Sequence, residues 1–501
     1  MKKKLLPLAV AAGLVGAVSA AQAEMHVNHN GLGEVLIYPF YSANGGNDTY
    51  VHVVNTTEYT KAVKVRFIEA MNSQEVLDFN LYLSPEDVWA GVITADPNGE
   101  GAIIRTVDES CTVPELGQSA GVHVGSKTTL ANGKTRRDQR FVNTLYDIEG
   151  ETERGFDRTV EGYLEIIEMG QLDPTEGLGL AAVHKTDGIP NDCGAIRAAW
   201  SSGGAWATDS QEELLGWFEG EDYIGGGLYG FGVVINVDGG TSVGYDATAI
   251  ANFAWEENFE TLHSGSSDLL PSLAQANEWA SIFDSNTATA SDYEFSSGID
   301  AVSALLMKSS ISNDYLVDPA VNGSTDWVVS MPTKSFYVSA EPAAEPFSVA
   351  WDGETRSCEP VGMAHWDREE LYPTTPVQGP GFSPQPEGAP SDEYVLCTEV
   401  SVLHFGEESA LKGSDRISYG FTPNYNEGWA RMSFLPIDLA DPSEFDGLRQ
   451  IEDLDGNIFN GLPVIGFAVF NYVNGVLGDG ILSNYQAGTT HKAQTLISLP
   501  Q

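Results

Sequence analysis

Short stretches of alternating apolar and polar residues dominate the first hundred positions of the chain. Within residues 62–70, Val63, Val65 and Phe67 would point to one face of a strand and the residues between them to the other. Turn-forming clusters of Asn, Gly, Ser, Thr and Pro separate this stretch from four others of the same kind, at 34–38, 49–55, 76–83 and 88–93. Strands at such regular spacing predict a β-sandwich over residues 24–100. An immunoglobulin-like arrangement is its simplest version, although the segment has no Cys–Trp–Cys core.

The middle of the chain mixes strand and helix periodicities. Residues 160–169 are strand-like, and residues 225–237 are glycine-rich before they too become strand-like, with a hairpin turn at Asp238-Gly239. Apolar residues at helical spacing occur in five segments, at 193–200, 209–218, 246–255, 269–283 and 299–307. We therefore expect residues 101–325 to form a mixed β/α region.

Strand patterns return over residues 326–501. The predicted strands are 327–331, 335–339, 394–405, 429–434 and 464–472. Six prolines within 372–390 predict an extended loop there. The predicted fold class is mainly β with some helices, in which the N-terminal sandwich is followed by a larger β-rich body with helical insertions. The pattern leaves open whether these regions are separate domains or one interleaved body.

The charge balance narrows the functional classes. The 501 residues include 71 Asp and Glu but only 25 Lys and Arg, which gives a formal net charge of −46. Recognition of phosphates requires clustered cations, so a nucleic-acid partner is disfavoured. A hydrophobic content of 42% is enough to build cores, so the acidity does not indicate a disordered tail.

The N-terminus carries the features of a signal peptide. Lys2, Lys3 and Lys4 precede an apolar stretch at 5–18, and Ala21-Gln22-Ala23 is a cleavage site of the A-x-A type. We expect residues 1–23 to be removed and the protein to be exported, to the cell surface, the extracellular medium or the periplasm. No transmembrane segment is predicted after cleavage, because the uncharged stretch 456–478 contains asparagines, a proline and several glycines.

Four cysteines fit an exported chain. An even number without C-x-x-C spacing favours disulfides over a redox motif or a zinc site. Three pairings are possible, and the pairing of sequence neighbours is favoured because neighbours most often share a domain. The favoured bridges are Cys111–Cys193 and Cys358–Cys397.

The few cations are unevenly distributed. Five of the 25 fall within fourteen positions, at Lys127, Lys134, Arg136, Arg137 and Arg140. One interpretation is a solvated hairpin with ordinary salt bridges. The other is an interaction patch that contacts an acidic face of a second copy, or an anionic sugar.

One acidic turn resembles the beginning of a calcium-binding loop. Asp453, Asp455 and Asn457 match D-x-D-x-N, but Ile458 and Val464 stand where an EF-hand requires Gly and Glu. The EF-hand is therefore excluded, and a different calcium site at these three residues remains a hypothesis.

Other motifs do not define a catalytic site. Gly225, Gly227 and Gly230 match G-x-G-x-x-G, but a strand pattern follows where a dinucleotide-binding fold needs a helix. Paired acids for glycoside hydrolysis cannot be picked out among so many carboxylates. Tryptophans at 200, 206, 217 and 366 could stack on sugars, although tryptophans in a β-rich chain more often belong to the core.

Several segments suggest a family likeness. GEVLIYPFY (33–41), VVNTT (53–57), EGYLEIIEMG (161–170), TDWVVSMPTK (325–334) and LPVIGFAVFNYVNG (462–475) look like parts of uncharacterised secreted proteins of proteobacteria. The resemblance implies export but no particular chemistry. In composition the chain is also similar to acidic surface-layer proteins. We therefore expect a secreted or cell-surface, non-enzymatic protein that assembles or adheres; the alternative is an extracellular protein that binds or degrades carbohydrate.

Overall fold

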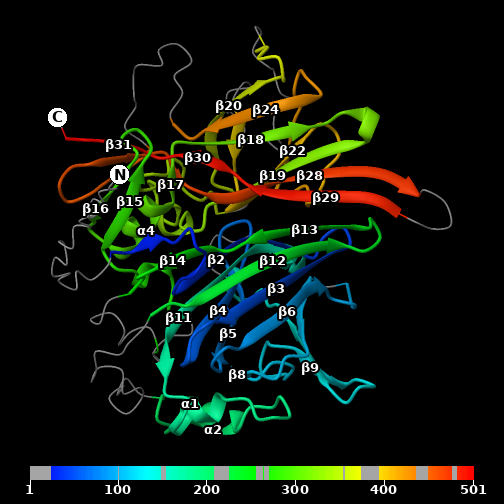
Figure 1. The fold of residues 1–501 in the computed structure, drawn as a ribbon, viewed down its shortest axis with the longest axis vertical. Helices are drawn as coiled ribbons and strands as arrows, with labels where there is room; N and C mark the ends of the chain where they lie inside the picture. Colours follow the sequence, from blue (N-terminus) through cyan, green and yellow to red (C-terminus); the bar gives the residue numbers. More distant parts are fainter. Residues whose placement is uncertain are drawn as a thin grey trace, which may run out of the picture.

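The computed structural model describes residues 24–99, 101–147, 154–207, 225–254, 263, 270–353, 356–373, 394–435, 449–476 and 482–500. The protein is mainly β, as the sequence predicts, and its sheets stack in two halves along the long axis (Figure 1). The predicted signal peptide, the predicted helix at 209–218 and most of the Pro-rich stretch lie outside the described residues.

Two seven-stranded sheets build the half that contains the N-terminal strands. The first sheet has the order β1 (His26–Val27), β14 (Thr248–Ala251), β2 (Val35–Ser42), β11 (Glu161–Leu172), β4 (Thr60–Glu69), β5 (Glu75–Leu83) and β8 (Cys111–Val113). The second sheet has the order β13 (Thr241–Asp246), β12 (Leu228–Asn236), β3 (Asn47–Asn55), β6 (Val88–Ala95), β7 (Ala102–Thr106), β10 (Thr135–Arg140) and β9 (Gly125–Thr129).

These two sheets share one core. Val65 and Phe79 from the first sheet and Val53 and Trp89 from the second are all buried in the same cluster. The rings of Phe79 and Trp89 lie 5.7 Å apart across the interface. The sheets therefore pack face to face, and their strands are drawn from positions as far along the chain as Ala251. The immunoglobulin-like topology stays a prediction.

The other half contains two five-stranded sheets. The third sheet has the order β23 (Ser418–Phe421), β22 (Val400–Phe405), β19 (Gly323–Ser330), β28 (Ile465–Val476) and β29 (Leu482–Thr490). The fourth sheet has the order β21 (Tyr394–Leu396), β20 (Glu359–Trp366), β24 (Glu427–Ser433), β18 (Ser310–Leu316) and β30 (Lys492–Gln494). Strand β19 joins two cores, because Trp327 belongs to the cluster shared with the fourth sheet and Val328 to the cluster of the first half.

Smaller elements complete the fold. They are the β15 (Trp279–Asp284) and β16 (Thr289–Glu294) hairpin, the β17 (Met307–Lys308) and β27 (Leu462–Pro463) pair, and the three strands β25 (Gln450–Glu452), β26 (Ile458–Asn460) and β31 (Leu496–Ser498). The described helices are short: α1 (Gly177–Ala182), α2 (Cys193–Trp200), α4 (Gly298–Leu306) and α5 (Ser335–Val338).

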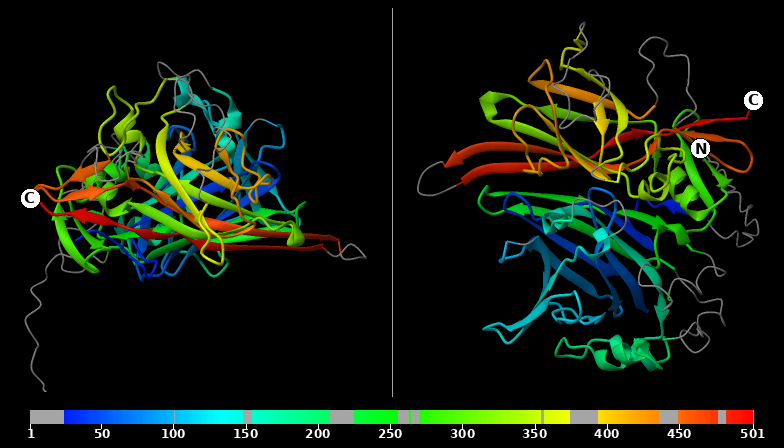
Figure 2. Two further views of the ribbon diagram at one scale, coloured as in Figure 1. Left: turned by 90° about the horizontal axis from the view of Figure 1, so that it is seen from above. Right: turned by 180° about the vertical axis from the view of Figure 1, so that it is seen from behind.

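The two halves are in direct contact along β13 and β29, which run side by side where the halves meet (Figures 1 and 2). The rings of Tyr245 and Phe467 stack there with centroids 4.6 Å apart. The Nδ2 of Asn484 donates to the carbonyl of Gly239 at 2.6 Å. Apolar and polar contacts therefore both fix one half against the other.

Strands were predicted better than helices. The helices expected at 193–200 and 299–307 are confirmed as α2 and α4. The helix expected over 246–255 is wrong: β14 forms there because it pairs with β2 and buries Ala249 and Ile250. Most of the helix expected over 269–283 is likewise replaced by β15. The strand expected at 335–339 is instead the single helical turn α5.

Candidate functional site

The cationic residues singled out in the sequence lie on the hairpin formed by β9 and β10, at one edge of the second sheet. Four of the five have acidic partners nearby: Lys127 with Glu115 at 2.6 Å, Arg136 with Asp138 at 3.1 Å, Arg137 with Glu109 at 2.7 Å and Arg140 with Asp96 at 3.5 Å. Lys134 is exposed in the turn. The hairpin is thus an edge of mixed charge rather than a large uncompensated positive patch.

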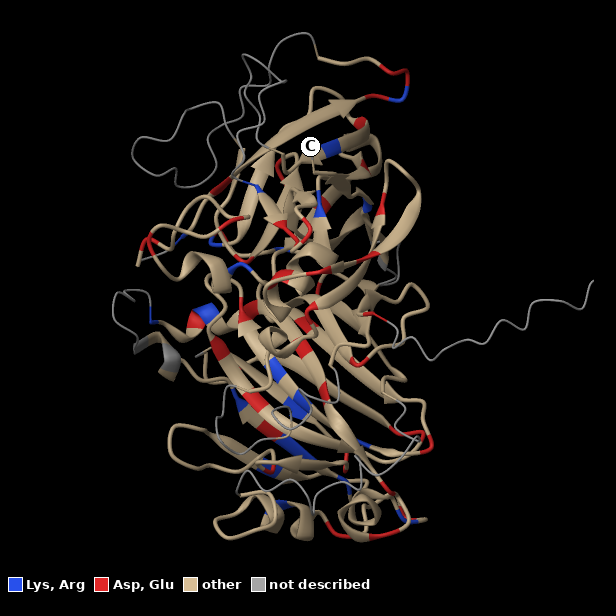
Figure 3. Ribbon diagram, turned by 90° about the vertical axis from the view of Figure 1, so that its left-hand side faces the viewer, with Lys and Arg blue, Asp and Glu red and all other residues tan. Residues whose placement is uncertain are grey.

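The same pairing of charges runs across the first sheet (Figure 3). Arg66 on β4 contacts Glu75 on β5 and Glu165 on β11, both at 2.7 Å. Lys61 and Glu168 form a fully buried pair at 2.6 Å. Buried charges of this kind need partners, so several of the few cations serve the interior of the protein.

The predicted calcium turn is held by its own hydrogen bonds. Oδ1 of Asp453 accepts from the backbone N–H groups of Asp455 and Asn457, at 3.0 and 2.7 Å, and its Oδ2 accepts from the Asn457 side chain at 2.7 Å. Asp455 points to solvent. Within the described residues no three His, Cys, Asp or Glu side chains are grouped closely enough to hold a metal ion. Calcium binding at this turn stays a prediction.

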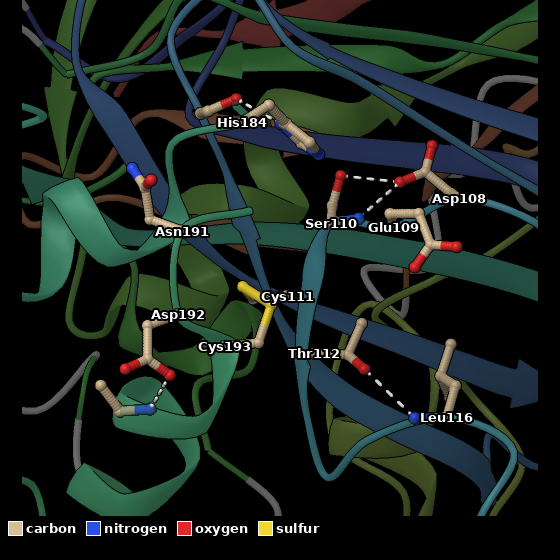
Figure 4. Close-up of a disulfide and its surroundings, with 12 residues drawn as sticks. Asp108, Glu109, Ser110, Cys111, Thr112, Leu116, His184, Asn191, Asp192 and Cys193 are labelled. Carbon is tan, nitrogen blue, oxygen red and sulfur yellow. Dashed lines mark hydrogen bonds between the residues drawn. A yellow bond between two sulfur atoms is a disulfide. The ribbon is translucent and has the colours of Figure 1, made fainter. Parts of the chain in front are cut away.

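Both disulfides have the favoured pairing. Cys111–Cys193 joins β8 to the first residue of α2, and Cys358–Cys397 joins the segment before β20 to the end of β21. Asp192 caps α2 by accepting from the Ala195 N–H at 3.0 Å (Figure 4). Each bridge therefore attaches a peripheral segment to a sheet.

A cavity of about 340 Å³ lies beside the Cys111–Cys193 bridge. Its charged lining contains three acids and three bases: Glu109, Glu115, Asp192, Arg137, Lys185 and Arg197. Burial opposes ionisation of Glu115, but the hydrogen bond from Lys127 and the charge of Arg197 nevertheless lower its pKa. Because acids and bases are equal in number around the cavity, its charge does not favour one class of ionic ligand.

The most unusual surface is the outward face of the second sheet. Antiparallel sheets commonly bury one apolar face and expose a polar one. Here the inward residues Val51 and Val53 are buried, yet the outward residues on β6, β3 and β12 are also almost all apolar or aromatic. This apolar face consists of Val88, Ala90, Val92, Tyr50, His52, Val54, Tyr229, Phe231, Val233 and Ile235.

The residues of the apolar face are accessible to solvent. Tyr50 is 39% exposed, Tyr229 38% and Val88 50%. At the centre, His52 stacks on Phe231 with ring centroids 4.6 Å apart and on Tyr50 at 6.4 Å. Partial burial lowers the pKa of His52, so neutral imidazole is favoured in this stack. The centre of the apolar face is therefore a stack of uncharged aromatic rings.

Charged residues border the apolar face on two sides. Asp246 on β13 is exposed at one margin, in register with Phe231. At the other margin Arg105 on β7 pairs with Asp138 on β10 at 2.9 Å, and Arg136 contacts the same carboxylate. An apolar centre with a charged rim is the usual anatomy of a protein interface.

Sequence patterns gave a partial signal for this face. The stretch 49–55 alternates as a strand should, but its outward positions hold Tyr50, His52 and Val54 instead of charged residues. Strands with apolar residues on both sides are usually buried between two layers. Only the structure shows that one of these sides faces solvent.

The hairpin of β12 and β13 contains a sequence motif that is found in hydrolases, but not the structure that the motif requires. Gly240-Thr241-Ser242-Val243-Gly244 has the Gly-x-Ser-x-Gly spacing of a hydrolase nucleophile elbow. That elbow requires a sharp turn from a strand into a helix. Ser242 instead lies within β13, paired with Ile235 of β12. The motif therefore carries no catalytic assignment.

No protein-family model, no curated protein sequence and no solved structure matches the chain. The likeness to secreted proteobacterial proteins stays a prediction. No helix in the described ranges has the length and apolar character needed to cross a bilayer.

Proposed function

We propose that this protein is an exported, non-enzymatic structural protein whose copies associate through the apolar face of the second sheet. Export is supported by the signal-peptide pattern and by the two disulfides, since disulfides persist in oxidising compartments. The observation that carries the proposal is the solvent-exposed, aromatic-rich face of β6, β3 and β12.

The size of the apolar face fits the centre of an interface. Neighbouring strands lie about 4.8 Å apart, so three strands and half a spacing on either side are roughly 15–20 Å wide. Over about 20 Å of strand length, the projected area of the apolar face is roughly 300–400 Å². A standard interface buries about 800 Å² on each partner. The apolar face would therefore supply the dry centre, and the bordering charged residues would supply the rim.

The charged residues at the margins of the apolar face favour a second copy of the protein as its binding partner. Sheets stack face to face with their strands nearly aligned. A two-fold axis parallel to the strands reverses the strand order, so that the β13 margin of one copy faces the β7–β10 margin of the other. Asp246 of each copy then approaches Arg105 and Arg136 of its partner. In this arrangement part of the basic hairpin meets acidic groups of another copy at the rim.

A charge introduced at the centre of the apolar face tests the proposal. Phe231→Asp would place a carboxylate in the dry centre, where burial of an unpaired charge is costly. We expect the association constant, measured by sedimentation velocity, to fall at least about a hundredfold, or about 3 kcal/mol.

The matched control is Leu454→Asp, which adds the same charge at a residue that is 61% exposed in the turn before β26. This variant should associate like the wild type. Equal association of Phe231→Asp and wild type would refute the apolar face as the contact.

A further inference from the structure

The outward face of the fourth sheet carries a second, independent feature: a row of stacked aromatic rings. Trp366 on β20 and Trp429 on β24 occupy facing positions in the register, and their rings stack with centroids 4.1 Å apart and planes 12° apart. Tyr372 extends the row, with its ring 5.5 Å from Trp366. The tryptophans are half-buried, whereas Tyr372 is 55% exposed. Of the tryptophans singled out in the sequence, Trp206 is buried and Trp217 lies outside the described residues.

Beyond the aromatic row, the outward face of the fourth sheet carries small side chains. Farther along the same face, beside and beyond Ala364 and Arg431, the outward positions of β20, β24 and β18 hold small residues: Gly362, Ser433 and Ser312, with Ser310 buried beside them. Small side chains leave the sheet surface open to a ligand, and serine hydroxyls can donate and accept hydrogen bonds. The aromatic row thus borders one end of this surface of small residues, which we call the floor.

Two cations border this floor. Ser312 on β18 is in register with Arg431 on one side and with Lys492 on the other, so these cations are two strand spacings, about 10 Å, apart. The Arg431 guanidinium lies 5.4 Å from the Trp429 ring centre and 5.7 Å from that of Trp366. Both cations are exposed, and neither forms an ion pair with a residue that the structure describes. Two acids lie beside the row: Asp314 is exposed and in register with Trp429, and Glu427, two residues from Trp429 on β24, pairs with Arg368 at 2.8 Å.

Two exposed cations are thus available to an anionic ligand on this face, in a chain with 71 Asp and Glu. Aromatic rings bind the apolar faces of sugar rings, and arginine binds carboxylates through paired hydrogen bonds. An extended chain of uronic acids presents both groups at repeated intervals. Single-stranded DNA also presents rings and anions, but it lacks the free hydroxyl groups along its chain that the serine side chains can bind.

We propose that this aromatic face, defined by Trp366, Trp429, Tyr372, Arg431 and Lys492, binds an acidic polysaccharide built from uronic acids. Sugar rings stack against the free side of the aromatic row. Arg431 and Lys492 pair with carboxylates of successive sugars, and the serine floor accepts hydroxyl groups. This site is separate from the apolar face of the second sheet, so binding and self-association are independent properties.

The test measures binding of polygalacturonate, with a neutral galactose polymer and single-stranded DNA as comparison probes, by affinity electrophoresis and calorimetry. The wild type should bind polygalacturonate, more weakly at high salt, and should bind the neutral polymer at least about tenfold more weakly. Trp429→Ala should abolish binding. Arg431→Gln, at an exposed position, should weaken polygalacturonate binding about tenfold while leaving the thermal midpoint unchanged.

Matched controls separate this site from other surfaces. Tyr485→Ala removes an aromatic ring that is 61% exposed on β29 and should bind like the wild type. Phe231→Asp should also bind like the wild type, even if it no longer associates. Absence of polygalacturonate binding, equal binding of the neutral polymer, or an unaltered Arg431→Gln variant would each overturn the proposal. Binding of DNA that is lost in the same variants would reassign the face to another polyanion and overturn it as well.

Discussion

Glu161 is the first residue of β11 and contacts Ser414, in the loop between β22 and β23 of the other half. Its carboxylate accepts from the backbone N–H of Ser414 at 3.0 Å. Burial away from water raises its pKa from 4.5 to about 7, more than the hydrogen bonds from Ser414 and Ser42 lower it. The folded protein therefore retains a proton that the unfolded chain releases. The contribution of Glu161 to the free energy of unfolding is therefore complete below pH 4.5 and is lost as the pH rises through about 7.

Glu161→Gln should remove this pH dependence, because the amide keeps an acceptor oxygen but cannot ionise. The free energy of unfolding of the wild type should fall by up to about 3 kcal/mol more than that of the variant between pH 4.5 and pH 8. Chemical denaturation at several pH values measures the difference. Glu176→Gln, at an exposed carboxylate, is the control. Parallel profiles for wild type and Glu161→Gln would contradict the buried ionisation.

The sequence pattern predicted that EGYLEIIEMG (161–170) forms a strand, but it did not predict that the glutamates of this strand are buried. Glu161, Glu165 and Glu168 are at most 2% exposed, although alternation alone would place charged residues toward water. Their partners, such as Arg66 and Lys61, come from β4, about a hundred residues away. Partners this distant are set by the register of strands, which local patterns do not encode.

At the scale of elements, strand patterns succeeded where side-chain alternation matched burial. In β3 and β4 the inward residues Val51, Val53, Val63 and Val65 were identifiable from the pattern. The predicted helix over 246–255 failed because pairing of β14 with β2 outweighs helical spacing in a stretch of small residues. The favoured cysteine pairing succeeded because each bridge joins neighbouring cysteines of one half.

Removal of the Cys111–Cys193 bridge should act mainly on α1 and α2. The bridge closes a segment of 82 residues, and loss of such a closure costs about 3–4 kcal/mol. Replacing both cysteines by Ala should lower the free energy of unfolding by that amount and speed hydrogen exchange over 193–200. The apolar face is on the other sheet of the sandwich, so self-association should persist. Unchanged exchange in α2 would contradict the anchoring role of the bridge.

At the scale of the whole molecule, the net charge of −46 opposes contact between copies. The apolar face and its rim must overcome that repulsion. The sequence identified the acidity and the basic hairpin, but it could not show that the hairpin borders an exposed apolar face, since this juxtaposition depends on the order of strands in the second sheet. Added salt should therefore preserve or strengthen an apolar contact, because it screens this repulsion, and should weaken a contact made by ion pairs.

The most direct measurement is sedimentation velocity of the wild type over a salt series that ends near 1 M, where the screening length is about 3 Å. If the apolar face forms the contact, screening of the mutual repulsion should leave association intact or strengthen it as salt increases. A protein that stays monomeric at every salt concentration, or a dimer that dissociates as salt is added, would contradict the account.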